Sequence, residues 1–257
     1  MAPITAKVRA VFDKISKVIY NMDMKFSKDV LQSKGITYNQ KYPYGELAKV
    51  TKNKKRHYET PDGRQVPSVT TVLSALKDMT HLHAWRKRVG TEKAQQITTE
   101  SANIGTVMHR SLEKHVKGED RTPGSNLIQQ KAHKMANVII DNGLNDVSEV
   151  WGSEVSLYYP ELYAGTTDLV GVYKGAPAIM DFKQARRLKK REWVEDYFLQ
   201  LVAYAEAHNK TYDTQIKTGR IFICTQNNKY QTFDIDDYDN WVGKWYAKLE
   251  QYYKLIL

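Results

Sequence analysis

Asp168, Asp181 and Lys183 lie in the mainly apolar stretch 165–183, and residues of these types at this spacing could do chemistry. The stretch predicts two short strands joined at Lys174-Gly175, because glycine supplies the positive φ that a tight hairpin turn needs. A turn centred there places Asp168 roughly opposite Asp181. Alternation along the second strand then puts Lys183 on the same face as Asp181.

Two carboxylates in this register repel each other. At ~4 Å and an effective dielectric constant of ~20, the repulsion is about 4 kcal/mol before screening. A divalent cation held between Asp168 and Asp181 removes the conflict, and Lys183 offsets part of it. Phe182 lies between the charged residues in sequence and faces the other side of the strand. The pattern favours a metal site, with solvated charges at two strand ends as the structural alternative.

The composition bounds the class of protein. A chain of 257 residues can form one substantial domain with elaborations or two small ones. The formal net charge of +10 favours a polyanionic partner, nucleic acid first. A single cysteine, Cys224, excludes intrachain disulfides and a cysteine-ligated zinc or iron–sulfur cluster. No run is long enough to span a membrane and the first thirty residues lack a signal-peptide pattern, so we expect a cytoplasmic location and no membrane partner.

Periodicity and turn signals predict the elements that must position these residues. Residues 1–30 have the spacing of an amphipathic helix, and residues 31–66 are turn-rich and basic, forming either a solvated loop or a phosphate-contacting one. The remaining expected helices are one capped by Ser68, 81–97, one beginning near Gly105, 127–142, 192–209 and 241–257. The expected strands are 149–159, the two of the central hairpin, 217–225 and 229–235. We expect a helical and basic extension over 1–66 and a second, main domain over 67–257.

Several polar residues elsewhere could join the two aspartates. His109 and Glu113 are four residues apart and share a helical face, so the imidazole could reach a metal, although a lone histidine is more often structural. Glu154 falls within an expected strand, and Gln200 and Tyr204 are again four apart on a helix.

Two basic runs could contact a phosphate backbone. The run that directly follows Lys183 is the better placed, and the run near 54 is either a solvated loop or a phosphate contact. Together with one arginine of the 81–97 helix, the candidates are Arg186, Arg187, Lys189, Lys190, Arg191, Lys54, Lys55, Arg56 and Arg86.

These motifs, taken in order, resemble the PD-(D/E)xK nuclease superfamily and its RecB-like exonuclease branch. The matching elements span about 68–205 and are Gly105-Thr106 with His109, Glu154, Gly165-Thr-Thr-Asp168, Asp181-Phe-Lys183, and Gln200 with Tyr204. The segment from Pro67 to Leu73 and the helix with Trp85 are also similar to the mitochondrial genome maintenance exonuclease and its phage and bacterial relatives. The chain departs from the branch at Gln184, where threonine is frequent, and in lacking the four cysteines that hold an iron–sulfur cluster in some relatives.

The resemblance implies an α/β, restriction-endonuclease-like core with a central mixed sheet flanked by helices. It also implies a Mg²⁺ or Mn²⁺ cofactor, and no iron–sulfur cluster is expected. The implied metal ligands are His109, Asp168, Asp181 and the carbonyl of Phe182.

Four further residues receive roles from the same resemblance. Lys183 would orient or activate the attacking water and stabilise charge on the phosphate. Gln200 and Tyr204 would position the strand or support the site, and Glu154 would be a water-mediated ligand or a partner of Lys183.

The sequence thus predicts a metal-dependent DNA exonuclease acting on free ends, on single strands or single-stranded tails. A structure-specific endonuclease on the same core is one alternative. A non-catalytic nucleic-acid-binding module is another, although carboxylates beside a phosphate site would repel its ligand. DNA repair, DNA recombination and a phage origin are all compatible with the resemblance.

Overall fold

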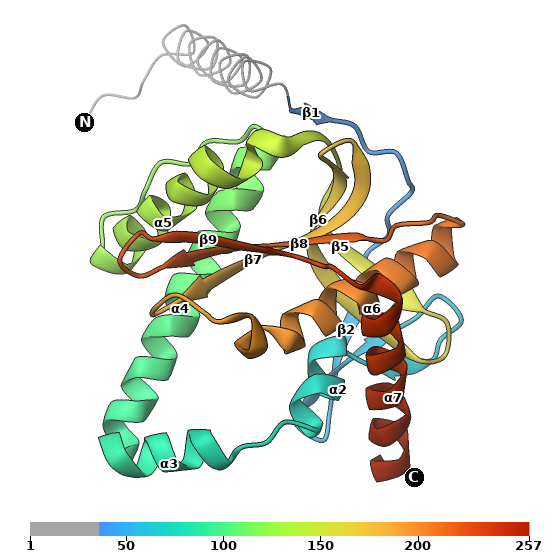
Figure 1. Cartoon of the computed structure of the whole chain (residues 1–257), viewed down its shortest axis with the longest axis horizontal. Coiled ribbons are helices and arrows are strands. Elements are labelled where there is room, and N and C mark those ends of the chain that lie inside the picture. Colours follow the sequence, from blue (N-terminus) through green and yellow to red (C-terminus); the bar gives the residue numbers. More distant parts are fainter. Residues whose placement is uncertain (1–35, 257) are drawn as a thin grey trace, which may run out of the picture.

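The computed structural model describes residues 36–256, in which a six-stranded mixed sheet separates two layers of helices (Figure 1). The strand order is β1-β5-β6-β7-β8-β9; β1 pairs with β5 and β7 with β8 in parallel, and the other pairs are antiparallel. The strands are β1 (Thr37–Tyr38), β5 (Val147–Tyr159), β6 (Tyr163–Tyr173), β7 (Ala176–Ala185), β8 (Thr218–Thr225) and β9 (Tyr230–Asp234). The expected α/β class with a central mixed sheet is confirmed.

Helices cover both faces of this sheet, and each face has its own apolar core. On one face lie α4 (Thr91–Val116) and α5 (Leu127–Gly143). On the other lie α6 (Glu195–Tyr212), α7 (Tyr238–Ile256) and the short α2 (Val69–Ala75). Strand β7 is apolar on both faces because Met180 joins the first core and Ile179 the second.

The helix termini follow local capping chemistry. The side chain of Ser68 accepts a hydrogen bond from the Thr71 backbone at the start of α2, as the sequence predicted. Helix α5 begins with a reciprocal capping box between Asn126 and Gln129. Within the described range, no helix combines the length and the apolar character that crossing a bilayer requires.

The helix expected over 81–97 is wrong, and so is the helix start expected near Gly105. The structure has α3 (Thr80–Val89) and then one long helix, α4, which passes through Gly105. The break falls at Gly90, whose φ of 85° is one that helices do not adopt. Gly105 instead lies where α4 crosses close to β7, since a β-carbon there would be 3.5 Å from the Gln184 side chain.

Part of the turn-rich segment expected over 31–66 is a small antiparallel sheet, which the sequence did not predict. Its strands are β2 (Ala48–Lys52), β3 (Lys55–Glu59) and β4 (Gln65–Pro67). Positive φ angles at Asn53 and Lys54 make the first turn, and Tyr58 and Val66 bury against Ala164 of β6. These few buried positions left only a weak apolar pattern. The helix expected over 1–30 lies outside the described residues.

Two glycine substitutions test this account of the backbone. Gly175 has a φ of 79° in the β6–β7 turn and Gly243 lies within α7, and a β-carbon at either site would meet no atom within 4 Å. Gly175→Ala should therefore lower the free energy of unfolding by about 1 kcal/mol through backbone strain alone. Gly243→Ala should raise it by about 0.5–1 kcal/mol, because alanine favours a helix. Urea unfolding of both variants measures the change in the free energy of unfolding. A change of the same sign in both would contradict the turn geometry.

Candidate active site

The candidate site lies in a fork between β6 and β7. These strands pair from Tyr173–Ala176 as far as Leu169–Met180. Beyond that point β7 continues beside β8 and β6 continues beside β5. Asp168 and Asp181 occupy the first positions after the pairing ends, as the predicted turn required.

Inside the fork, the carboxylate of Asp168 takes the place of a backbone carbonyl of β6 as the hydrogen-bond acceptor for β7. Its Oδ2 accepts a hydrogen bond of 2.7 Å from the backbone N–H of Phe182. Its Oδ1 lies 3.2 Å from Nδ1 of His109, which reaches in from α4. The side chain of Phe182 is turned into the core beneath α4 and α5, on the face predicted from strand alternation.

Asp181 and Lys183 form a close pair on the opposite face of β7. The Lys183 ammonium lies 2.5 Å from Oδ2 of Asp181, whose side chain is only 2% exposed. That oxygen is buried, and the Lys183 ammonium is the cation that lies against it. Burial alone would lower the pKa of Lys183, but the charges of Asp181 and Asp168 outweigh it and raise that pKa.

Helix α6 supports the lysine through a short chain of hydrogen bonds. Lys183 donates to Oε1 of Gln200 at 3.2 Å, and the Gln200 amide donates to the hydroxyl of Tyr204 at 3.2 Å. The Tyr204 ring fits only because residue 165 is glycine, since a β-carbon there would lie 2.6 Å from the ring. The Lys183 ammonium also lies 5.1 Å from the ring centroid of Tyr197, a contact that sequence analysis missed.

Glu154 approaches the site from β5 with a strained backbone. Its φ is 54°, and the flanking pairs Ser153–Leu169 and Val155–Thr167 place it across from Asp168. One ligand atom from each of His109, Glu154 and Asp168 falls within 4.8 Å of the others. The ion-pair partner of Lys183 is Asp181, and Glu154 lies instead with His109 and Asp168, a group that could hold a metal ion.

Burial and neighbouring charges shift the pKa values of the acids. Burial, with the charge of Asp168 added, raises the pKa of Asp181 to about 6 against the opposing charge of Lys183. Burial and the same Asp168 charge raise the pKa of Glu154 to about 7. Burial would also raise the pKa of Asp168 itself, but His109, Lys183 and the Phe182 N–H outweigh it and lower that pKa. Burial would lower the pKa of His109, and the charge of Asp168 reverses this and raises it.

The donor set fits a hard divalent cation. Carboxylate oxygens from Asp168, Asp181 and Glu154 are the ligands that Mg²⁺ and Mn²⁺ prefer, and one imidazole, that of His109, suits Mn²⁺ as well. Burial is the largest cause of the raised pKa values of Asp181 and Glu154, and the charge of Asp168 adds to it, so a bound cation would offset part of the cost of ionising them.

A groove leads to these residues over α4. It has a volume of about 550 Å³. His109 and Glu154 line it together with Glu113, which is held by an ion pair of 2.6 Å to Lys117. The remaining lining residues are Lys49, Gly105, Thr106 and Arg110.

The two basic runs lie at the surface, and their members differ in whether they already form ion pairs or hydrogen bonds. Arg191 binds Asp236 at 2.7 Å. Lys190 lies 3.8 Å from Glu192. The half-buried Lys189 hydrogen-bonds to Gln231 through its backbone.

The other basic candidates form no ion pair within the described part of the chain; they are Arg186, Arg187, Lys54, Lys55, Arg56 and Arg86. Arg186 and Arg187 line a hollow of about 280 Å³ with Asn227 and Lys229 from the β8–β9 turn. These two arginines are therefore the freest members of the run to meet a phosphate.

Sequence analysis also missed an aromatic residue beside this run. Trp193 lies in the short 3₁₀ helix η2 (Arg191–Trp193) between β7 and α6, and it is 54% exposed. The Lys190 ammonium lies 5.6 Å from its ring centroid. Between Glu192 and Val194, a single large aromatic gives no signal of its exposure, although its position directly after a basic run could have drawn notice.

No protein-family model and no curated protein matches this sequence. Among solved structures, the chain is similar to a protein from Eubacterium rectale described as a "Putative exonuclease", with 15% identity and a TM-score of 0.44. That match covers 59% of this chain and 64% of the other, so the chain spans less than two thirds of that protein. A second match is SSO0001, with 16% identity over 66% of this chain and 70% of the other and a TM-score of 0.35. A third is the alkaline exonuclease LHK-Exo from Laribacter hongkongensis, with 11% identity over 58% and 77% and a TM-score of 0.29.

The residues singled out in the sequence fall on a hairpin and on the helix that follows it, as their spacing predicted. Asp168 is on the first strand of the hairpin, Asp181 and Lys183 are on the second, and Gln200 is on the following helix.

Metal binding at this site should stabilise the protein in a pH-dependent way. A cation competes with protons for Asp181 and Glu154, whose pKa values of about 6 and about 7 leave both ionised at pH 8 and protonated at pH 5. Saturating Mn²⁺ should raise the Tm by about 5 °C at pH 8 and by much less at pH 5. Asp168→Asn should abolish the difference, whereas Glu92→Gln, on an exposed part of α4, should preserve it. An equal rise in all three proteins would place the metal elsewhere.

Proposed function

We propose that this protein is a metal-dependent DNA exonuclease that hydrolyses phosphodiester bonds from free ends of single strands or single-stranded tails. One observation supports this above the others: two buried aspartates, one paired with a lysine, meet in the fork where β6 and β7 part. Two buried like charges lower the stability of the folded protein, so a site that served folding alone would not place both aspartates in the fork.

A bound Mg²⁺ or Mn²⁺ would supply Lewis acidity and a water of lowered pKa. His109, Asp168, Asp181 and the carbonyl of Phe182 would hold it, with Glu154 as an additional carboxylate on the same side. The backbone N–H of Phe182 fixes one oxygen of Asp168, which leaves the other oriented toward His109 and the cation.

Lys183 is held ready to act on the attacking water. Its ammonium is anchored by Asp181 and by Gln200, so it keeps one position while retaining a third proton to donate. Its raised pKa keeps it cationic at neutral pH, so it orients the water and stabilises charge on the phosphate rather than accepting a proton. Gln200 and Tyr204 are positioning residues that act through it.

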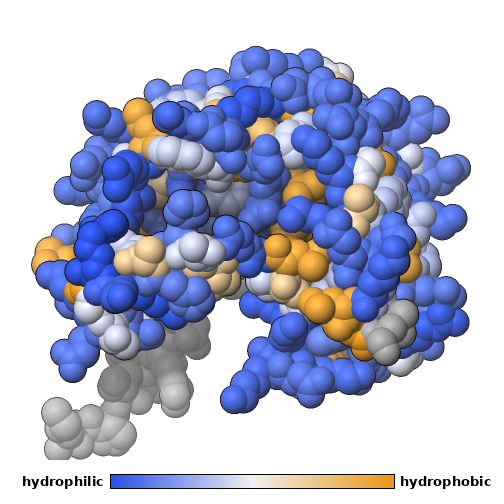
Figure 2. All heavy atoms as spheres, turned by 60° about the horizontal axis from the view of Figure 1, so that its bottom comes forward, coloured by the Kyte–Doolittle hydropathy of each residue, from blue (hydrophilic) through white to orange (hydrophobic). Residues whose placement is uncertain are grey.

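The strand would reach the site along a basic, hollowed face. Helix α3 buries none of its residues and projects from the body with the start of α4, carrying Arg86 (Figure 1). Figure 2 shows this face hollowed between the part that carries α3 and the part that carries α2 and the end of α7. We infer that the hollow admits a nucleic acid end, with Arg186 and Arg187 holding phosphates on one side. Lys54, Lys55 and Arg56 at the β2–β3 turn would hold them on another.

Digestion of end-labelled linear DNA with Mg²⁺, Mn²⁺ or EDTA tests the proposal. We expect metal-dependent shortening from one end, and a covalently closed circle should remain intact because it offers no end. Asp181→Ala and Lys183→Ala should each lower kcat at least about a hundredfold while DNA binding persists, because each removes transition-state stabilisation rather than affinity.

Two outcomes would contradict the proposal. Retention of DNA in a gel without cleavage under either metal would indicate a binding module. Cleavage of the closed circle would indicate an endonuclease on the same core.

Trp193 should contribute to a preference for unpaired bases. An exposed ring beside a basic run can stack on a base, a contact of about 1–3 kcal/mol that duplex DNA does not offer. Trp193→Ala should raise the KM for a single-stranded oligonucleotide about tenfold with little change in kcat, and Trp193→Phe should restore most of the affinity. Equal effects of both substitutions on single-stranded and duplex substrates would refute stacking.

A further inference from the structure

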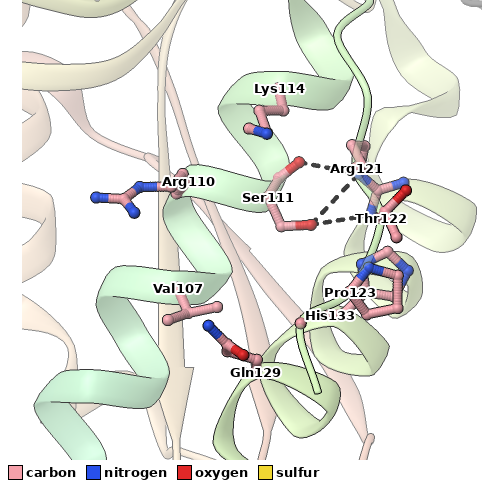
Figure 3. Close-up of a pocket in the computed structure, with 10 residues that line it drawn as sticks. Val107, Arg110, Ser111, Lys114, Arg121, Thr122, Pro123, Gln129 and His133 are labelled. Atoms are coloured by element: carbon pink, nitrogen blue, oxygen red, sulfur yellow. Dashed lines mark hydrogen bonds between the residues drawn. The ribbon is translucent and has the colours of Figure 1, made fainter. Parts of the chain in front are cut away.

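A second pocket lies on the side of α4 that faces away from the metal-binding residues. It has a volume of about 140 Å³ and is closed by the loop 117–126 and the first turns of α5 (Figure 3). Val107, Ser111 and Lys114 line it from α4, on the opposite side of the helix from His109 by their spacing. The other lining residues are Arg110, Arg121, Thr122, Pro123, Gly124, Gln129 and His133.

The lining of this pocket is cationic. None of its residues is acidic, and Lys114 and Arg121 carry permanent positive charge. The nearest carboxylates along the chain are engaged in other contacts. Asp120 accepts hydrogen bonds from the Thr122 backbone and hydroxyl, and Glu113 is paired with Lys117.

Arg121 is fixed in place by neutral acceptors. Its Nε donates to the Ser111 carbonyl at 2.9 Å, and its Nη2 donates to Ser111 Oγ at 3.2 Å and to Asn137 Oδ1 at 2.6 Å. Burial lowers its pKa, and the charge of Asp141 on α5 opposes that shift. The hydrogen bonds of this half-buried guanidinium go to neutral groups, so its charge is not paired by them. An anion could therefore bind to it without a rearrangement of the side chain.

Other donors converge on the same space. The Lys114 ammonium donates to the Asp120 carbonyl at 2.9 Å, and the lining also includes Thr122 and Gln129. Burial lowers the pKa of His133, and the positive charge of Arg121 lowers it further. The loop approaches closely enough that a β-carbon on Gly124 would lie within 2.8 Å of three side-chain atoms of Gln129.

Arg110 connects this pocket with the groove of the candidate active site, because it lines both. Figure 3 shows its guanidinium extending from α4 away from Arg121. A helix with its side chains is about 10 Å across, a distance that a few nucleotides of an extended strand can cross.

We propose that the pocket between α4 and the loop 117–126 binds a phosphate group of the substrate strand, a few nucleotides from the site of cleavage. This inference rests on the proposed nuclease function and adds a binding site to it. The strand would pass from the metal-binding residues over Arg110 and place a backbone phosphate between Lys114 and Arg121. A phosphate bound there would extend the contact between protein and strand over more nucleotides, away from the reacting atoms.

Lys114→Gln tests the pocket with Lys134→Gln as control, because Lys134 is an exposed lysine of α5 outside the lining. For an oligonucleotide of ten or more nucleotides, Lys114→Gln should raise KM about fivefold, leave kcat unchanged, and reduce the salt slope of binding by about 0.7. Lys114→Arg should restore KM. A mononucleotide ester too short to reach the pocket should be hydrolysed equally by all variants. An unchanged KM and slope would overturn the proposal.

NMR titration of His133 separates this result from the nuclease function. In the wild-type protein, inorganic phosphate and an oligonucleotide should each raise the pKa of His133, because either anion counters the charge of Arg121. A response to inorganic phosphate alone, with the strand KM unchanged in Lys114→Gln, would overturn the strand contact and leave a free-anion site. If the wild-type protein cleaves nothing, the nuclease function fails, whereas the His133 response and the salt slope still decide whether the pocket binds the strand.

Discussion

The main constraint on this structure is that two carboxylates, which repel each other, are buried together in the fork of β6 and β7. Regular pairing of the strands would continue past Leu169 and Met180, but Asp168 enters the fork and accepts the N–H of Phe182. The sheet therefore exchanges a strand-to-strand backbone bond for a buried anion beside a second one. That exchange is unfavourable for stability unless a cation joins the pair, which links the fold to the chemistry.

Residues from three elements of the fold surround the two aspartates. His109 approaches Asp168 from α4, Lys183 approaches Asp181 along its own strand, and Glu154 adds a further carboxylate from β5. The support of Lys183 continues through Gln200 to Tyr204. Each layer of the fold thus contributes one part of the site, and a change in helix packing would move a functional group.

Much of this arrangement could be predicted from the sequence because it follows from short-range rules. The glycine turn after Lys174 fixed the hairpin register, and strand alternation separated Phe182 from its charged neighbours. Spacing of four residues placed Gln200 and Tyr204 on one helical face. The capping residue Ser68 likewise located the start of α2.

The parts that could not be predicted depend on tertiary contacts or on unusual backbone. Glu154 reaches Asp168 through a positive φ, which no sequence pattern at a glutamate indicates. Helix α4 runs through Gly105 because its packing overrides a residue that weakens helices. The exposure of Trp193 and the clustering of Lys114 with Arg121 arise only when distant segments meet. The sheet β2–β4 has too few buried residues to show a clear alternation.

The central claim is that these acids and His109 together hold a divalent cation. A crystal structure with Mn²⁺, phased on its anomalous signal, tests this most directly. The account predicts an anomalous peak in contact with Asp168 and His109, absent in crystals of Asp168→Asn. A protein that degrades DNA with Mn²⁺ while the peak lies away from the fork, or persists in the variant, would contradict it.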